Sequence, residues 1–434
     1  MRNPKILATG IIGTVALTMA LSACGVGGSG GNSNDSQKKV DADAPLKGSL
    51  TFQTWSLKNP TFTPYFTSLI NTFQKDHPGT KINWVDQPGA NYADKVVSQV
   101  TSGSLPDVVN LPPDIAYSVA KTGGLLDLKK NVPTLDSTYV SSGLKAYTYS
   151  NVQGTYAFPW YLGADMNYWN GAMLERDGLD TKKLPTSLDE LTAQAKVMHD
   201  KSGGKDRLMS RMPWLNDIVQ SGTPLTNKDQ TKFVFNTPAA AAMLDKYRAA
   251  YKSGYLPSTV LTTAYMGNNA AFLKQEVAWT TGQGNGIQQA QQTNPTLAKE
   301  MIPSPSIGTP ILNVQGISVS SKSKNLSLAL AFAKFVTDNQ NQVNFVKLAQ
   351  GFLPGTVAAA HDPAYSKSDG TPQGDAAVIS YQDLQTAVNY QPPVWTQDMT
   401  TILNQQFALA ISGKETSKKA LDNIVNKANQ LLSD

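Results

Sequence analysis

The feature that most constrains the fold is an alternation of strand-like and helix-like segments early in the chain. Residues 49–54 alternate polar and apolar side chains, as a half-buried strand does. From Phe66 onward, apolar residues recur at intervals of three and four, and this helical pattern ends at Pro78. Residues 81–85 return to a period of two. This strand–helix–strand order predicts a layered α/β domain with largely parallel strands.

Later helices are predicted by the residues that cap them. Ser187 and Glu190 have the spacing of a capping box. Thr237 is followed by a proline, which suits the first position of a helix, and Asp338 precedes another amphipathic segment. The chain closes on an apolar stripe that begins at Leu421. These stripes are expected to face the core.

Length and charge narrow the class of protein. The 434 residues exceed what one hydrophobic core usually organises, so we expect two domains. Charged residues make up 16% of the chain, against about 25% in an average protein. The formal charge of +5 is spread thinly, without the basic stripe of a nucleic-acid-binding protein. We therefore expect no nucleic-acid partner.

Cysteine and histidine usage limits the covalent and metal chemistry. A single cysteine excludes an intramolecular disulfide and a cysteine-cluster metal site. His77, His199 and His361 lie far apart and lack the spacing of a zinc-binding helix. The aspartate-rich residues 362–375 lack the spacing of a calcium-binding EF-hand loop. We therefore expect neither a metal nor a cofactor.

The N-terminus has the pattern of an exported protein. Arg2 and Lys5 precede an uncharged apolar run, residues 6–21, which is too short to cross a membrane comfortably and predicts a secretory signal peptide. The run ends in Leu-Ser-Ala-Cys, which resembles the lipobox of bacterial lipoproteins. The only thiol of the chain, Cys24, stands at the position that is lipidated in that motif. An ordinary secretory signal with an incidental cysteine is the alternative.

The lipoprotein interpretation fixes the expected location. Residues 1–23 would be removed as the signal peptide, and residues 24–45 would form a flexible tether rich in Gly, Ser and Asn. Two acyl chains hold a protein on a membrane, whereas one does so marginally. We therefore expect a body anchored through Cys24 to the outer face of the bacterial cell membrane.

Eight short blocks follow one another in an order typical of one known family. They are residues 50–55 (LTFQTW), 92–96 (YADKV), 105–109 (LPDVV), 124–128 (GLLDL), 154–159 (GTYAFP), 167–170 (NYWN), 185–191 (PTSLDEL) and 271–278 (AFLKQEVA). With them the body, from about Leu46 to Leu432, resembles the extracellular solute-binding proteins of ABC importers, in the carbohydrate-binding family that includes maltose-binding protein. It departs from that family at Leu188, where tryptophan is usual, and at Gln275, where glycine is usual.

The resemblance implies a periplasmic-binding-protein-like α/β fold with two discontinuous lobes joined by a hinge. Lobe 1 would comprise residues 46–160 and 311–358, and lobe 2 residues 161–310 and 359–434. Crossings between the lobes are expected near residues 159–164, 303–310 and 354–360. Ligand would lie between the lobes, and closure would present a docking surface to a membrane permease.

A sugar ligand calls for aromatic plates against its C–H faces and fixed polar groups for its hydroxyls. Trp84, Trp169 and Trp279 lie in strand-like runs, so we expect them in the core. The other four tryptophans lie at loops or strand ends, where the family builds its cleft; for each of them packing is the alternative to ligand contact. These four are Trp55, Trp160, Trp214 and Trp395.

Six polar side chains complete the expected site. They are Lys58, Asp114, Tyr161, Gln283, Asn285 and Asp398. Asp114 follows two prolines beyond a strand, and a helix N-cap is its alternative role. Gln283 and Asn285 lie in a glycine-rich turn that lacks the Lys-Ser/Thr of a phosphate-binding loop.

These features predict a monomeric, substrate-capturing lipoprotein of an ABC sugar importer. It would bind an oligosaccharide of roughly two to four units and deliver it to the transmembrane subunits of the permease. A binding protein for a polyamine or a peptide is the alternative, although the candidate site is mainly aromatic and amide. A surface glycosidase would need two carboxylates about 5–10 Å apart across the sugar, and no recognisable motif supplies them. We therefore expect no enzymatic activity.

Overall fold

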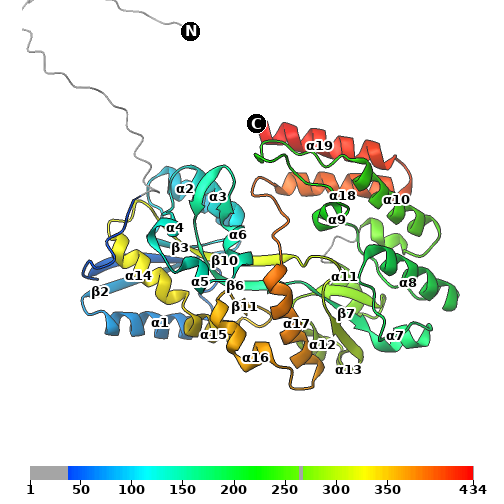
Figure 1. Ribbon diagram of the computed structural model, residues 1–434, viewed down its shortest axis with the longest axis horizontal. Coiled ribbons are helices and arrows are strands. Elements are labelled where there is room, and N and C mark those ends of the chain that lie inside the picture. Colours follow the sequence, from blue (N-terminus) through cyan, green and yellow to red (C-terminus); the bar gives the residue numbers. More distant parts are fainter. Residues whose placement is uncertain (1–37, 263–266, 434) are drawn as a thin grey trace, which may run out of the picture. The chain divides into compact units, whose positions relative to one another are not determined.

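The computed structural model describes residues 38–262 and 267–433, and these are built on two separate β-sheets (Figure 1). The large sheet has the strand order β11-β6-β10-β3-β1-β2, and the small sheet has the order β8-β7-β9. The large-sheet strands are β1 (Gly48–Trp55), β2 (Thr80–Gln87), β3 (Val108–Leu111), β6 (Phe158–Ala164), β10 (Leu312–Val319) and β11 (Leu353–Pro354); the small-sheet strands are β7 (Met166–Asn170), β8 (Trp279–Gly282) and β9 (Met301–Ser304). A separate pair joins β4 (Thr148–Tyr149) and β5 (Val152–Thr155). The expected signal peptide and Cys24 lie outside the described residues.

Strand direction follows the expectation only in part. β1 is parallel to β2 and to β3, with Gly48 beside Thr80 and Phe52 beside Val108. β10 is antiparallel to β3 and β6, β11 is antiparallel to β6, and the small sheet is antiparallel throughout. The prediction of largely parallel strands was therefore wrong beyond β1, β2 and β3. A parallel neighbour is reached by a crossover that returns along the same sheet. β10 is instead entered from β9 of the small sheet, so it starts at the edge where β3 and β6 end.

Helices cover both faces of the large sheet (Figure 1). One face is covered by α1 (Thr63–Asp76), α14 (Leu326–Val336) and α15 (Asn339–Leu348); the other is covered by α2 (Tyr92–Thr101), α3 (Pro113–Lys121) and α17 (Pro372–Thr386). On the first face, Phe52 of β1 meets Phe332 of α14 edge to face, with ring centroids 5.3 Å apart. Two buried faces explain why β3 is apolar at three of its four positions, and why the polar Gln53 and Thr54 of β1 are buried as well.

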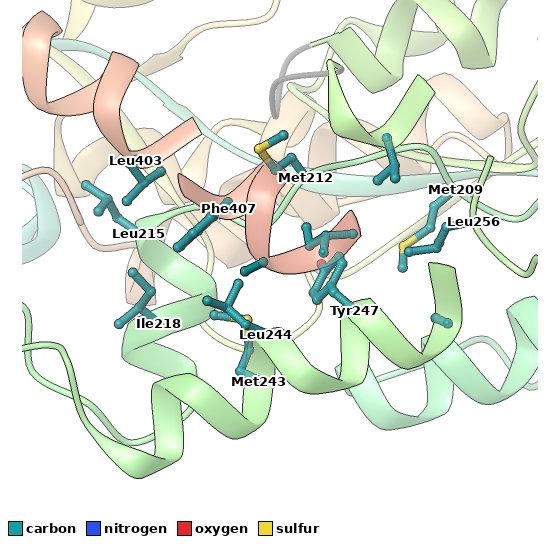
Figure 2. Packing of buried hydrophobic residues seen from close by; sticks show 14 of the residues in the cluster. Met209, Met212, Leu215, Ile218, Met243, Leu244, Tyr247, Leu256, Leu403 and Phe407 are labelled. Carbon is teal, nitrogen blue, oxygen red and sulfur yellow. The ribbon is translucent and has the colours of Figure 1, made fainter. Parts of the chain in front are cut away.

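The small sheet is accompanied by a larger set of helices. The main ones are α8 (Leu188–Lys201), α9 (Leu215–Gln220), α10 (Pro238–Lys252), α18 (Gln397–Ser412) and α19 (Ser417–Ser433). Figure 2 shows Leu215 and Ile218 of α9 lying between Met243 of α10 and Leu403 of α18. The amphipathic C-terminal helix predicted around Leu421 is confirmed as α19, and its apolar stripe is buried. None of the helices in residues 38–262 and 267–433 combines the length and the hydropathy that a membrane span requires.

Short elements connect these layers. They are α4 (Leu128–Asn131), α5 (Leu135–Thr138), α6 (Ser141–Ala146), α7 (Gly171–Arg176), η2 (Ser258–Leu261), α11 (Gly267–Leu273), α12 (Gly286–Thr293), α13 (Pro295–Glu300), η3 (Val357–His361) and α16 (Pro363–Ser366).

The predicted helix caps are present with one change. The Ser187 hydroxyl accepts the Glu190 N–H at 3.2 Å, but the Glu190 carboxylate accepts the Thr186 N–H at 2.7 Å instead of that of Ser187. Thr237 caps α10 and Asp338 caps α15 through their side-chain oxygens. These caps satisfy backbone N–H groups that would otherwise lack partners at the helix starts.

Three segments connect the elements around the two sheets. β6 ends at Ala164 and β7 begins at Met166, so a single residue separates a large-sheet strand from a small-sheet strand. Residues 305–311 lead from β9 to β10, and residues 387–396 lead from α17 to α18. The boundary expected after residue 160 falls inside β6, and the one expected after residue 358 precedes α17, which packs against both β6 and β9.

Candidate ligand-binding site

The carboxyl ends of β1, β3 and β6 share one edge of the large sheet, which we call the site edge. In open α/β sheets, ligands bind outside this edge because the loops that leave the strands gather there. Trp55 ends β1, Asn110 lies near the end of β3, and β6 continues from this edge toward the small sheet.

An aromatic pair stands at the end of β1. The rings of Trp55 and Tyr92 are stacked, with centroids 5.1 Å apart and planes 1° from parallel. Tyr92 is 2% exposed, and its hydroxyl donates to the carbonyl oxygen of Asn110 at 2.7 Å. Burial raises the pKa of the Tyr92 phenol, so the hydroxyl keeps its proton and remains a donor. The buried Tyr92 therefore fixes the orientation of the half-buried Trp55.

Buried and half-buried amides lie beside this pair. Gln53 and Gln99 exchange hydrogen bonds through their side-chain amides, at 3.1 and 2.8 Å. Asn110 donates to Gln315 Oε1 at 3.0 Å, while its own Oδ1 is buried and has no hydrogen-bond partner among the described residues. Asn110 is 0% exposed, so this oxygen lies inside the sheet layer and not on the surface of the site edge. The sequence signal for Asn110 was a polar residue inside the apolar run Val-Val-Asn-Leu, and our sequence analysis missed it.

A polar cavity of about 160 Å³ adjoins the first turn of α3. Its lining includes Asp114 and Asn313 together with Asn389 and Gln391 from the segment between α17 and α18. Burial raises the pKa of the Asp114 carboxyl, opposed by hydrogen bonds from backbone N–H groups. Pro112 occupies the N-cap position of α3, so Asp114 belongs to the first turn and not to the cap. The cavity thus offers one carboxyl and three amides to a hydroxylated ligand.

Trp214 lies on the small-sheet side, immediately before α9. The Asp217 carboxylate accepts the Trp214 backbone N–H at 2.7 Å and two guanidinium N–H groups of Arg211 at 2.8 and 2.9 Å. The Arg211 guanidinium in turn lies over the Trp279 ring, 5.5 Å from its centroid. This buried pair fixes the backbone from which the half-buried Trp214 side chain projects.

The glycine-rich turn after β8 contacts the strand that leads out of the large sheet. The Gln283 amide lies against Gly163 of β6 so closely that a Cβ at position 163 would lie 2.8 Å from it. The Gln283 carbonyl accepts the Tyr168 hydroxyl at 2.6 Å. Asn285 donates weakly to the Gln350 carbonyl at 3.4 Å. Gln283 therefore lies where β6 leaves the site edge.

Two of the tryptophans expected at the site lie in the cores. Trp160 is 0% exposed, and its ring centroid is 4.7 Å from that of Phe345. Trp395 is 4% exposed, packs edge to face on Phe233 at 5.3 Å and donates from Nε1 to Thr400. Neither ring has a free face for a sugar, so the structure assigns both to the packing role.

The remaining expected residues occupy varied surroundings. Tyr161 packs on Phe345 and Phe352, with centroids 5.1 and 4.9 Å away. The Lys58 ammonium lies 5.2 Å from the Trp84 ring centroid, and Asp398 is exposed in the first turn of α18. Core placement is confirmed for Trp169 and Trp279, whereas Trp84 is only partly buried. Within residues 38–262 and 267–433, no three His, Cys, Asp or Glu side chains are placed to hold a metal ion.

Known proteins resemble this chain in sequence and in fold. A family model described as bacterial extracellular solute-binding protein matches residues 68–373. A protein from Synechococcus sp. MITs9220, provisionally described as an oligosaccharide periplasmic-binding protein, has 26% identity and a TM-score of 0.75, with 88% of this chain and 99% of that chain covered. A comparison with curated protein sequences found no match.

Two further solved structures share the fold. The GacH receptor of Streptomyces glaucescens, described unliganded and with acarbose, has 20% identity and a TM-score of 0.66, with 90% of this chain and 99% of that chain covered. An ABC substrate-binding protein from Listeria monocytogenes, in complex with cycloalternan, has the same identity and TM-score, with 89% and 99% covered. These likenesses confirm the expected two-lobe α/β fold.

Proposed function

Because the chain belongs to the bacterial extracellular solute-binding protein family, we propose that it captures an oligosaccharide and delivers it to the transmembrane subunits of an ABC permease. The observation that carries the sugar assignment is the site edge itself. There a fixed aromatic plate, Trp55 on Tyr92, lies on the same sheet edge as a cavity lined by Asp114 and three amides. Aromatic plates suit the C–H faces of sugars, and carboxyl and amide groups suit their hydroxyls.

The solved relatives support this ligand class. The Synechococcus protein is provisionally described as binding oligosaccharides, and the other two structures are described with acarbose and cycloalternan. A polyamine site would need several carboxylates around one cavity. The cavity at α3 has one, Asp114, among the described lining residues.

We assign the ligand contacts to residues of both lobes, one built on the large sheet and the other on the small sheet. On the large-sheet side they are Trp55, Asp114 and Asn313; on the small-sheet side they are Trp214, Gln283 and Asn285. We place the first lobe boundary at Asp165, between β6 and β7, and keep the second within residues 305–311. Ligand would favour the closed form only through contacts that the open form lacks.

We propose that the protein is exported and lipidated before it binds its ligand. The signal peptide would be removed before Cys24, and lipid on that cysteine would hold the monomeric body outside the cell membrane. The protein would bind its sugar without cleaving it.

A thermal-shift screen tests the ligand class. The purified protein would be heated with a panel of di- to tetrasaccharides, and with amino acids, peptides and polyamines as the comparison set. A ligand present at about 100 times its Kd stabilises a protein by about 2.7 kcal/mol, which raises the Tm by several degrees. We expect a selective shift with one oligosaccharide. Shifts confined to amines or peptides would overturn the sugar assignment, and consumption of the sugar would overturn the assignment as a binding protein.

A further inference from the structure

The edge of the large sheet opposite the site edge has its own chemistry. β1, β2 and β3 begin there, and α1, α2 and α3 end there because each helix runs back along the strand before it. We call it the amino edge. At this edge the Asp107 carboxylate links β1 to the segment after β10, because it accepts the Thr51 N–H at 2.8 Å and the Ser323 hydroxyl at 2.5 Å.

Exposed lysines collect at the amino edge. Five surround the starts of β1 and β2 and the end of α1: Lys38, Lys39, Lys47, Lys75 and Lys81. Five more end α3, lie in α4 or follow β10: Lys121, Lys129, Lys130, Lys322 and Lys324. Six aspartates lie on the same edge (Asp41, Asp43, Asp76, Asp107, Asp127 and Asp136), which leaves a formal excess of four positive charges. Two of these aspartates, Asp107 and Asp127, are taken up by hydrogen bonds from the protein.

The chain enters the described body at this same edge. The Lys38 ammonium donates to the Ser321 carbonyl at 3.3 Å, and the Val40 N–H donates to Asn131 Oδ1 at 2.7 Å. The Ser327 hydroxyl donates to the Asp41 carbonyl at 2.8 Å. Cys24 precedes Lys38 by fourteen residues, a stretch that can span at most about 50 Å. A lipid on Cys24 would therefore keep the lysines within reach of the bilayer surface.

The amino edge also contains a cavity. It has a volume of about 480 Å³, and its polar lining comprises Ser49, Thr101, Thr122, Ser320, Lys322, Ser323 and Lys324 together with the Asp107 carboxylate, which accepts hydrogen bonds from Thr51 and Ser323. Hydroxyl groups beside two ammonium groups are donors that suit the oxygens of a phosphate ester. The cavity thus gives a phospholipid headgroup a place to enter between the lysines.

We propose that the amino edge docks on the headgroups of an anionic phospholipid membrane. The proposal rests on the lipid anchor at Cys24 that forms part of the proposed function. Lysines near an anionic membrane surface contribute roughly 1 kcal/mol each, and the contribution is lost beyond a Debye length. Because the site edge lies at the other end of the same strands, this docking leaves the sugar site facing away from the bilayer while solute is captured. Delivery to the permease then requires the amino edge to leave the headgroups.

Sedimentation with vesicles tests the proposal without the anchor. The chain from residue 25 onward carries the whole described body and has no cysteine. It is mixed with vesicles of phosphatidylcholine alone, or with one part in three replaced by phosphatidylglycerol, at low and high salt. The test variant carries Lys121→Glu, Lys322→Glu and Lys324→Glu. A matched control carries the same change of charge at Lys182, Lys201 and Lys205, three exposed lysines of the small-sheet part.

We expect binding to the phosphatidylglycerol vesicles alone, weakened by salt. The test variant should bind roughly 10- to 100-fold less tightly, and the control variant should bind like the unmodified protein. An equal loss of vesicle binding in the two variants would mean that the effect depends only on net charge, and would overturn the proposal. Equal binding of the unmodified protein to both kinds of vesicle would overturn it too, as would binding to neither.

A second readout separates this proposal from the proposed function. The thermal shift with the sugar should be the same in the test variant as in the unmodified protein. If no sugar shifts the Tm of either protein, the sugar assignment fails. The vesicle result still shows whether the amino edge docks on anionic lipid. If the sugar shift is lost in the test variant alone, the lysines act on the fold or on the sugar site, and the docking assignment is overturned.

Discussion

Asp217 holds Trp214 in place: its carboxylate accepts the Trp214 backbone N–H at 2.7 Å while it binds both terminal nitrogens of Arg211. All of this occurs out of water, because the side chains of Arg211 and Asp217 are each 5% exposed. An interior ion pair contributes little net stability, yet removal of one partner leaves the other charge buried and uncompensated. The orientation of a proposed ligand-binding ring therefore depends on a charge pair that does not touch the ligand.

The first prediction follows from that pair. Asp217→Asn should lower the free energy of unfolding by about 3 kcal/mol, because the Arg211 charge loses its counterion in the interior. Asp189→Asn, which breaks the surface pair with Lys246, should cost less than about 1 kcal/mol. Urea unfolding of the two variants measures both values. Equal costs would contradict the role given to Asp217.

The second prediction concerns the aromatic plate at the site edge. Trp55→Ala removes the ring that stacks on Tyr92 and should weaken sugar binding by about 10- to 100-fold, the range for loss of one well-oriented aromatic contact. Trp55→Phe keeps a ring and should recover part of the affinity. Calorimetric titration of both variants supplies the Kd values. Unchanged affinity in Trp55→Ala would remove this residue from the site.

The third prediction compares two glycines. A Cβ at Gly163 would lie 2.8 Å from the flexible end of the Gln283 side chain, so Gly163→Ala should displace that amide with little loss of stability. A Cβ at Gly316 would lie 2.6 Å from the buried Tyr147 ring, which cannot move aside, so Gly316→Ala should cost about 1–3 kcal/mol or more. Thermal unfolding separates the two. If Gly163→Ala proves the more costly, Gln283 is held more firmly than its contacts indicate.

The fourth prediction is a pH dependence at the segment between β9 and β10. Asp383 on α17 accepts the Ser306 N–H at 2.9 Å, and burial raises the pKa of its carboxyl to about 6. Between about pH 4 and pH 6 the folded protein keeps a proton that the unfolded chain has lost, so this group lowers stability as the pH rises through that range.

Asp383→Asn removes this titration. Since Asp383 is only partly buried, the variant should gain about 1 kcal/mol over the unmodified protein at pH 7.5 and nothing at pH 3.5. Asp375→Asn, at an exposed position of the same helix, is the control and should show no such gain. Urea unfolding at the two pH values checks it. A gain of equal size at both would mean that the effect is not the titration of Asp383.

Local sequence patterns predicted the elements well. Polar–apolar alternation located β1, the three-four spacing located α1, and the capping residues located α8, α10 and α15, because each depends on neighbours within a few positions. The direction of β10 was not predictable in this way. Its partners β3 and β6 lie far from it in the chain, so its direction depends on tertiary structure.

The site was harder to predict than the fold. Trp55 and Trp160 both stand at positions that resemble strand ends, but Trp160 is covered by Phe345, which lies 185 residues further along the chain. No local pattern reports such a contact. Asn110 and Asn313 were missed for a related reason. The role of a single polar residue in a strand depends on the sheet edge near which it lies, and that placement is set by tertiary structure.

Binding of an oligosaccharide at the site edge, with the sugar left intact, is checked by calorimetric titration of the purified protein with the sugar selected by thermal shift, followed by chromatography of the same sample after overnight incubation. We expect one-to-one binding in the micromolar range or tighter, lost in large part in Trp55→Ala, with the sugar recovered unchanged. Binding unaffected in Trp55→Ala and in Trp214→Ala, or recovery of shorter sugars, would overturn the proposed function.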